Sequence, residues 1–175
     1  MSDLHGFGIT LVRLSPGDLE TVRNWRNDPR VKDYMIFRDF ISEDDQKKWF
    51  LTIENARNHY SLIVHAGRRI GLTHVKNIDE AARSGEGGMF IYPEEYRNSV
   101  FAYRAAIVGT DWCFYDWGLR EITGRVLLTN RRAIRFNLGL GHVFDPPTPG
   151  RDVLTCRLTR DAYEKVRPGL VAAVS

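Results

Sequence analysis

The chain has 175 residues, of which 43% are hydrophobic and 27% are charged, and its formal net charge is +3. This length and apolar share suit one domain with its own core. Lysines and arginines form no run like a nucleic-acid-binding arm, so no nucleic-acid partner is expected, although a mildly basic surface would attract anionic small molecules.

The sequence also disfavours a secreted, a membrane-inserted or a metal-binding protein. The N-terminal residues include Asp3 and His5 without a long apolar stretch, so we expect no signal peptide, no stable membrane insertion and a cytoplasmic location. Two cysteines, Cys113 and Cys156, suit a cytosolic protein with reduced, buried thiols. The histidines show no metal-ligand spacing, so no metal is expected.

Alternation of apolar and polar residues predicts three strands in the first half of the chain, at residues 9–14, 60–65 and 70–75, the last two joined by a hairpin turn. Ser15 followed by Pro16 opens a helix that reaches about residue 27 and ends at Pro29. Ser42 with Asp45 forms a capping box for a second helix.

The second half alternates strands and helices. The predicted elements, in chain order, are a strand at 86–92 stopped by Pro93, a turn at 94–97, a helix at 98–118, a strand at 121–129, a helix at 130–139 and a strand at 152–160. The helix at 98–118 is apolar on nearly all sides, which predicts burial on two sides or a place in a homodimer interface. Residues after Arg167 are expected to be frayed.

This order of elements, with Tyr96 and Arg97 before the long helix and Asn130 opening the next one, resembles the GNAT family of acyl-CoA N-acyltransferases over about residues 8–160. The resemblance implies an α/β fold in one domain spanning 1–175, with a mixed central sheet of about six to seven strands flanked by helices. It also implies acetyl-CoA as co-substrate and a small-molecule amine as acceptor.

Two upstream segments, 22–31 and 41–50, narrow the resemblance. They are similar to the branch that acetylates the amine of UDP-linked amino sugars, and the ribosomal-protein N-terminal acetyltransferases are close to that branch. The basic charge balance favours the UDP-linked sugar over a cationic peptide.

The family holds the cofactor pyrophosphate with the pattern Arg/Gln-x-x-Gly-x-Gly/Ala. The matching residues are Arg97, Asn98, Ser99, Val100, Phe101 and Ala102. The first and last positions fit, whereas Val100 replaces a glycine that would let backbone approach phosphate closely. The unpaired N–H groups at a helix start favour an anion here in any case. Asn130 matches a position near the pantetheine arm and is also a natural helix N-cap.

The resemblance places a catalytic base at Glu86. His74, one strand earlier, is a second candidate, because a neutral imidazole facing the cleft is a good base near neutral pH. Many members carry a proton-donating tyrosine where this chain has Asn137, and an amide is no acid near neutral pH. Tyr92, Tyr96 or water are the alternatives.

Four residues at the end of the first helix match the acceptor side of the amino-sugar branch: Trp25, Arg26, Asn27 and Arg30. Arginines suit a diphosphate, and Phe37 and Phe40 could stack on a base or sugar. For Trp25 alone, a place in the core is the favoured interpretation. Gln46 stands where the branch usually carries histidine.

The sequence therefore predicts an acetyl-CoA-dependent N-acetyltransferase with a UDP-linked amino sugar as leading acceptor. A protein or peptide N-terminus is the second acceptor. The alternative from another class is a binding protein on a GNAT fold that has lost catalysis, which Val100 and Asn137 motivate.

Overall fold

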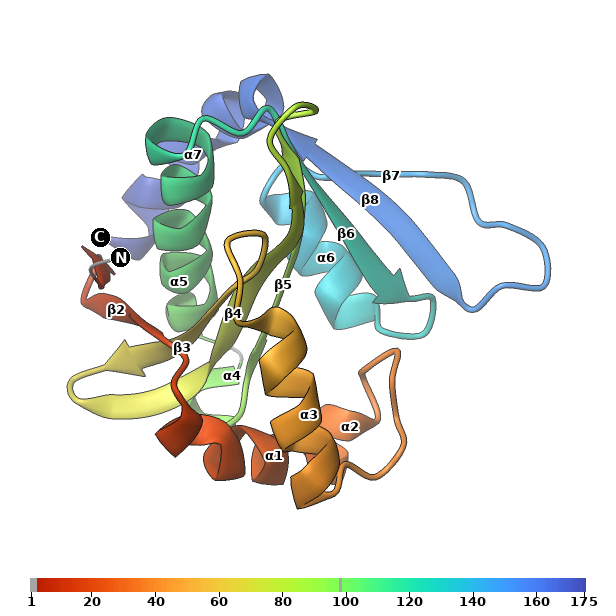
Figure 1. Ribbon diagram of the computed structural model, residues 1–175. Coiled ribbons are helices and arrows are strands. Elements are labelled where there is room, and N and C mark those ends of the chain that lie inside the picture. Colours follow the sequence, from red (N-terminus) through yellow and green to blue (C-terminus); the bar gives the residue numbers. More distant parts are fainter. Residues whose placement is uncertain (1–2, 98) are drawn as a thin grey trace.

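The computed structural model describes residues 3–97 and 99–175. Its strands form one sheet in the order β1-β2-β3-β4-β5-β6-β8-β7 (Figure 1). The strand bounds are β1 Leu4–Gly6, β2 Ile9–Arg13, β3 His59–His65, β4 Arg68–Asp79, β5 Ser84–Ile91, β6 Glu121–Leu127, β7 Val143–Phe144 and β8 Val153–Thr159. All neighbouring pairs are antiparallel except β5 and β6, which are parallel.

The helical segments, in chain order, are η1 (Pro16–Asp18), α1 (Leu19–Asn27), α2 (Pro29–Lys32), α3 (Glu43–Ile53), α4 (Glu94–Arg97), α5 (Val100–Asp111), η2 (Trp112–Asp116), α6 (Arg131–Gly139) and α7 (Arg160–Val174). The predicted caps are observed: the Ser42 side chain accepts from the Asp45 amide, and Asn130 accepts from the Ala133 amide at 3.1 Å.

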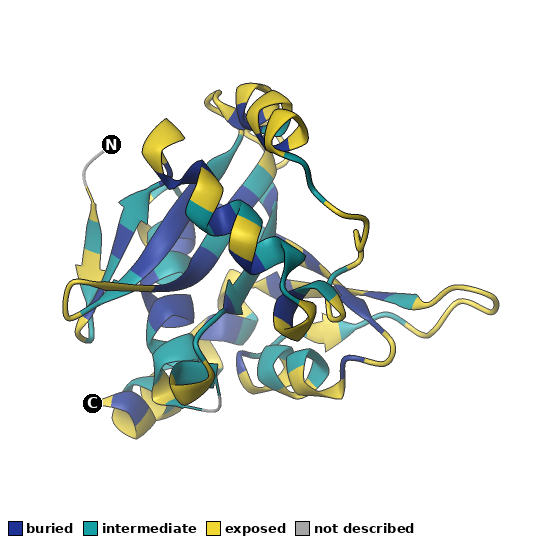
Figure 2. Ribbon diagram, turned by 90° about the horizontal axis from the view of Figure 1, so that it is seen from below, coloured by how far each residue is buried: buried dark blue, intermediate teal, exposed yellow. Residues whose placement is uncertain are grey.

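Helices cover both faces of the sheet. On one face, α1 and α3 pack Val22 and Phe50 against Leu62 and Leu72. On the other face, α5 packs against the opposite side of the same strands, which includes Ile63. Burial is concentrated in the central strands, while the outer sides of the helices are exposed (Figure 2). The alternation of Leu62 and Ile63 between faces is the period-two pattern of a sheet buried on both sides.

Strands β5 and β6 separate along their length. They pair only from Ser84 with Glu121 to Glu86 with Thr123, yet β5 continues to Ile91 and β6 to Leu127. All of these residues are among those described, so the parallel ladder ends at Glu86. Figure 1 shows the two strands diverging from this point. The backbone of β5 beyond Glu86 is therefore free of β6.

The mixed α/β fold with flanking helices is confirmed, and four details differ. The sheet has eight strands rather than six to seven, because β1 and β7 are too short to give a periodic signal. The long helix changes at Trp112 into the π-helical turn η2 and ends before Gly118. Strand β4 extends to Asp79, beyond the predicted end at residue 75, and β5 begins at Ser84, two residues before the predicted start at residue 86.

The frayed C-terminus was the fourth expectation, and it is wrong. Helix α7 continues to Val174, and its residues bond to α5. Asp111 accepts hydrogen bonds from the Tyr163 hydroxyl at 2.8 Å and from Arg167 at 2.7 and 2.8 Å. The Arg104 Nε donates to the Val174 carbonyl at 2.9 Å. These tertiary contacts hold the end of the chain in place.

Candidate active site

A cavity of about 650 Å³ lies where β5 and β6 separate. Gly88 and Phe90 line it from the face that α1 and α3 cover, because they pair with His74 and Leu72. Met89 lies on the alternate face, toward α5. The cavity thus has walls on both faces of the sheet.

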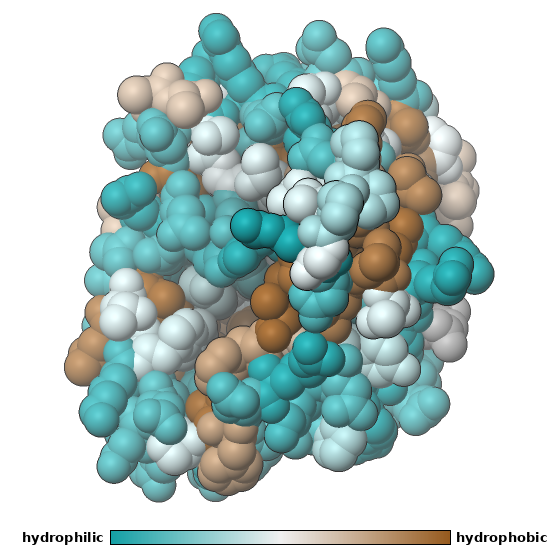
Figure 3. Space-filling model, turned by 90° about the vertical axis from the view of Figure 1, so that its right-hand side faces the viewer, coloured by the Kyte–Doolittle hydropathy of each residue, from teal (hydrophilic) through white to brown (hydrophobic). Residues whose placement is uncertain are grey.

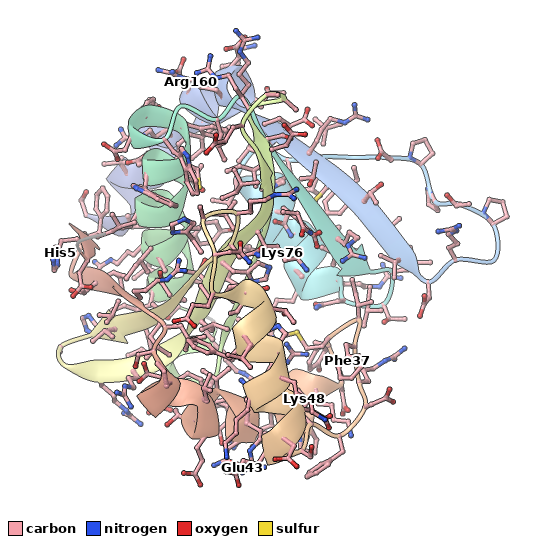
Figure 4. All side chains as sticks on the ribbon, in the orientation of Figure 1. His5, Phe37, Glu43, Lys48, Lys76 and Arg160 are labelled. Atoms are coloured by element: carbon pink, nitrogen blue, oxygen red, sulfur yellow. The ribbon has the colours of Figure 1, made fainter. Side chains whose placement is uncertain are left out.

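The mouth of this cavity is partly apolar. The segment 33–41 between α2 and α3 carries four exposed large hydrophobic residues that line it: Tyr34, Ile36, Phe37 and Phe40. Lys76 and Phe37, labelled in Figure 4, line the cavity from the sheet and from this segment respectively. On the molecular face shown in Figure 3, apolar side chains gather in a band surrounded by polar ones.

His74 of β4 lies in the wall of the cavity. Its ring stacks on Tyr60 with centroids 4.8 Å apart and an angle of 23° between planes. A Cβ on the facing Gly88 would lie 2.6 Å from His74 Cε1, so only glycine leaves room for the ring. Burial, and then the charge of Lys76, lower the pKa of His74 to about 3. The imidazole is therefore neutral near pH 7 and retains a lone pair.

Glu86 of β5 lies one pair further along the same face. Its Oε1 forms ion pairs with Lys76 Nζ at 3.3 Å and Arg125 Nη2 at 3.0 Å, and Asn77 donates to Oε2 at 3.3 Å. Burial alone would raise the pKa of Glu86, but the charges of Lys76 and Arg125 outweigh it and hold this pKa below its usual value. Glu86 is thus an ionised, bridging carboxylate that ties together β4, β5 and β6.

A smaller cavity of about 130 Å³ adjoins the ends of β5, α5 and α6. Arg30, Arg97 and Arg132 line it, and so does Ala102. Arg97 donates from Nε to the Ile91 carbonyl at 3.5 Å and from Nη2 to the Arg30 carbonyl. Arg30 is ion-paired with Asp28 at 2.6 Å, so Arg97 and Arg132, beside the start of a 12-residue helix, are the two arginines whose charge is available to phosphate groups.

The remaining residues of the predicted pyrophosphate segment are arranged around the start of α5. Ser99 is its N-cap and accepts from the Phe101 amide at 3.4 Å, while the Phe101 ring packs 4.2 Å from that of His65. Val100 is 40% exposed and lines neither cavity. Asn98 lies outside the described residues.

Asn130 lines both cavities, caps α6 and donates to the Tyr34 carbonyl at 3.5 Å. Asn137 lines the large cavity, and its amide donates to Ala133 at 2.9 Å. Of the two tyrosines proposed to replace the missing acid, Tyr92 bonds to Asp28 and Arg30, and Tyr96 packs against Phe101. Neither lines the large cavity.

The four acceptor-side residues separate in space. Arg26 lines the large cavity and Arg30 the smaller one. Asn27 forms two 2.9 Å hydrogen bonds with the backbone of Ile41, which anchor the 33–41 segment to α1. Trp25 is 8% exposed, stacks on Tyr92 at 5.3 Å and lines neither cavity, so the core interpretation is confirmed.

Sequence reasoning missed Tyr60, Lys76 and Arg125. Lys76 is two residues beyond His74 in one strand, so period-two alternation could have placed it on the same face. Arg125 could not have been found this way, because its contact with Glu86 depends on the β5–β6 register.

The sequence matches the acetyltransferase (GNAT) domain family over residues 9–142. The chain belongs to the GNAT acetyltransferase family. This GNAT protein is an acetyl-CoA-dependent N-acetyltransferase. No curated protein gives a significant match.

Solved structures share the fold of this GNAT protein. Spermidine N-acetyltransferase from Vibrio cholerae, in complex with CoA and spermine, superposes with a TM-score of 0.80 at 22% identity, covering 91% of this chain and 99% of that chain. A dodecameric structure of the same enzyme superposes with a TM-score of 0.72 at 22% identity, covering 90% of this chain and 97% of that chain. A domain from Methanocaldococcus jannaschii superposes with a TM-score of 0.75 at 16% identity, covering 86% of this chain and 97% of that chain.

The residues of this GNAT protein fit acetyl-CoA. Arg97 and Arg132 of the smaller cavity can hold phosphates, and the freed β5 backbone offers N–H and C=O groups to an extended chain. Within residues 3–97 and 99–175, no cluster of three or more His, Cys, Asp or Glu side chains is arranged to hold a metal. No helix in the described part of the chain is long and apolar enough to cross a membrane.

Proposed function

We propose that this GNAT protein acetylates the primary amine of a UDP-linked amino sugar. The observation that carries the proposal is a cavity with walls on both faces of the sheet, holding a neutral imidazole and a positive excess of charged side chains. It supports an acceptor that brings both an amine and negative charge.

The charged side chains of the cavity argue against a polycationic acceptor. Arg26, Lys76 and Arg125 are positive, whereas Asp45 and Glu86 are negative. The Glu86 carboxylate is already paired, and Asp45 bonds to Ser42 at 2.6 Å in a helix cap. A polyamine would find no free carboxylate deep in this cavity and would be repelled by its cations.

The chemistry assigned to the chain is a direct transfer. When bound, acetyl-CoA would supply the acetyl group as an activated thioester, whose C–S bond breaks as the amine forms the new N–C bond, and the thiolate would leave as CoA and take up a proton from water. His74 lines the cavity with a neutral imidazole and is the candidate to take a proton from the attacking amine, directly or through one water. The low pKa that burial imposes makes it a weak base until an anion is bound nearby. Glu86 keeps Lys76 and Arg125 in place beside it, and the free N–H groups of β5 are candidates to bond the developing oxyanion.

A covalent acetyl-cysteine route is disfavoured. Cys113 and Cys156 are the two cysteines of the sequence, and both are buried. Burial raises the pKa of Cys113 to about 12 and that of Cys156 to about 11. Since the thiolate is the nucleophile, neither is reactive near neutral pH.

The test is acetyl transfer from acetyl-CoA to a UDP-linked amino sugar, a peptide N-terminus and spermidine, with wild type and His74→Gln. We expect turnover of the nucleotide sugar and a loss in kcat of about 10²- to 10⁴-fold in the variant. Glu86→Gln is the matched comparison, and a larger loss in kcat in this variant than in His74→Gln would identify Glu86 as the general base. Turnover of spermidine or peptide in preference to the sugar would contradict the acceptor assignment.

A further inference from the structure

Arg26, in the last turn of α1, is a cation without a counter-ion. Its Nε is buried without a hydrogen-bond partner, and its one hydrogen bond, from Nη2 to the Phe37 carbonyl, is 3.4 Å long. No ion pair to Arg26 occurs among the described residues. An unpaired guanidinium with a buried N–H costs free energy, so such a group is retained where something else pairs with it.

Gln46, on α3, is a second unused donor. The residue is only 4% exposed, and its Nε2 is buried without a partner. It lies on the inner side of the helix, four residues before the buried Phe50, whereas Glu43 and Lys48 (Figure 4) are on the exposed side. A fully buried amide donor left unpaired costs about 1–3 kcal/mol.

These two donors line the same large cavity from different helices. Together they offer one positive charge and two buried N–H donors, Arg26 Nε and Gln46 Nε2, that have no acceptor among the described residues. The chemical complement of such a pair is a negatively charged oxygen.

We propose that Arg26 and Gln46 form a subsite for an anionic oxygen group, a phosphate or a carboxylate, carried by the acceptor on the same molecule as its reactive amine. This inference rests on the proposed function and adds the residues that select the acceptor. It excludes simple amines and polyamines as preferred substrates.

A bound anion would also act on His74. The charge of Arg26 is among those that lower the pKa of His74, after burial and Lys76. An anion paired with Arg26 offsets that charge and makes the imidazole a stronger base. An acceptor whose anionic group pairs with Arg26 therefore raises the basicity of His74, the group that takes the proton from the amine of the same acceptor.

The experiment compares Gln46→Leu and Arg26→Met with wild type on matched acceptor pairs. The first pair is a UDP-linked amino sugar and the same amino sugar without the nucleotide. The second is an amino acid and its amide. Lys48→Met, on the exposed side of α3, is the control.

In both variants we expect kcat/KM to fall about 10- to 100-fold for the member of each pair that carries the phosphate or carboxylate group. We expect little change for the member that lacks this group, and little change for either member in Lys48→Met. The melting temperature of Gln46→Leu should equal or exceed that of wild type, because the substitution removes an unsatisfied buried donor. Calorimetric titration with UDP and with glutarate provides a readout independent of turnover, and binding should weaken in the same two variants.

The outcomes separate the two proposals. Preference for a carboxylate-bearing amine over the UDP-linked sugar would sustain the subsite and contradict the proposed acceptor. Preference for neutral amines, equal losses on both members of a pair, or unchanged anion binding in both variants would overturn the subsite even if acetyl transfer is observed.

Discussion

At the scale of single residues, three partly buried histidines make stability depend on pH. Burial is the main cause that lowers the pKa of His59 to about 4, of His74 to about 3 and of His142 to about 4. In the unfolded chain these rings take up protons near pH 6.5, whereas in the folded protein they stay neutral. The unfolded state therefore binds more protons below that pH, and stability falls as the pH drops.

The predicted loss lies between about pH 6.5 and 4.5, above the range where carboxylates titrate, and is at most about 1.4 kcal/mol per pH unit for each histidine. Solvent screening of partly exposed rings reduces it. Urea unfolding at several pH values measures the slope, and His59→Phe should make it shallower. His5→Gln, at an exposed position, should leave it unchanged. An equal slope in His59→Phe and wild type would refute the assignment.

Residue types and spacing named three candidates that share one cavity, but not the partners of these candidates. His74, Glu86 and Arg26 all line the large cavity. That Glu86 is shared between Lys76 and Arg125, and that Arg26 has no counter-ion in the described part of the chain, depends on the strand register and on helix packing. Neither is encoded in local spacing.

At the scale of elements, one carboxylate joins two helices. Asp111 ends α5, and its oxygens accept from Tyr163 and Arg167 of α7. The Asp111–Arg167 pair is partly buried, with side chains 22% and 35% exposed, so loss of the carboxylate leaves two donors without an acceptor.

We expect Asp111→Ala to lower the free energy of unfolding by about 1.5–3 kcal/mol, because hydrogen bonds to a charged group are lost. Chemical denaturation measures the change. Asp116→Ala, an exposed position in the neighbouring η2, is the control and should stay within about 0.5 kcal/mol of wild type. A small effect at Asp111 would mean that apolar contacts alone hold α7.

Elements with strong local signals were predicted well, namely the capped helices α3 and α6 and the alternating strands β3 and β8. The failures share a cause, which is that tertiary contacts override weak local signals. Helix α7 contains Pro168 and Gly169, which disfavour a helix locally, and its order derives from contacts with α5. Strands β1 and β7 exist only by pairing with neighbours.

At the scale of the whole molecule, the separation of β5 and β6 is the feature that unites the fold and the site. The sheet is continuous from β1 to β7 except for this opening, and helices cover it on both sides. The order of strands and helices was enough to predict such a fold by resemblance. The walls of the cavity come from segments far apart in the chain, so its composition required the assembled structure.

An opening with walls on both faces has a kinetic consequence. Two reactants that can reach the same point from opposite faces need not wait for each other, and neither buried cysteine can hold the acetyl group between the two binding events. Initial rates measured at varied concentrations of both reactants should therefore give intersecting double-reciprocal lines. The pattern of product inhibition should show no fixed order of product release. Parallel lines would instead demand an acetylated intermediate on the chain, for which the buried cysteines offer no nucleophile.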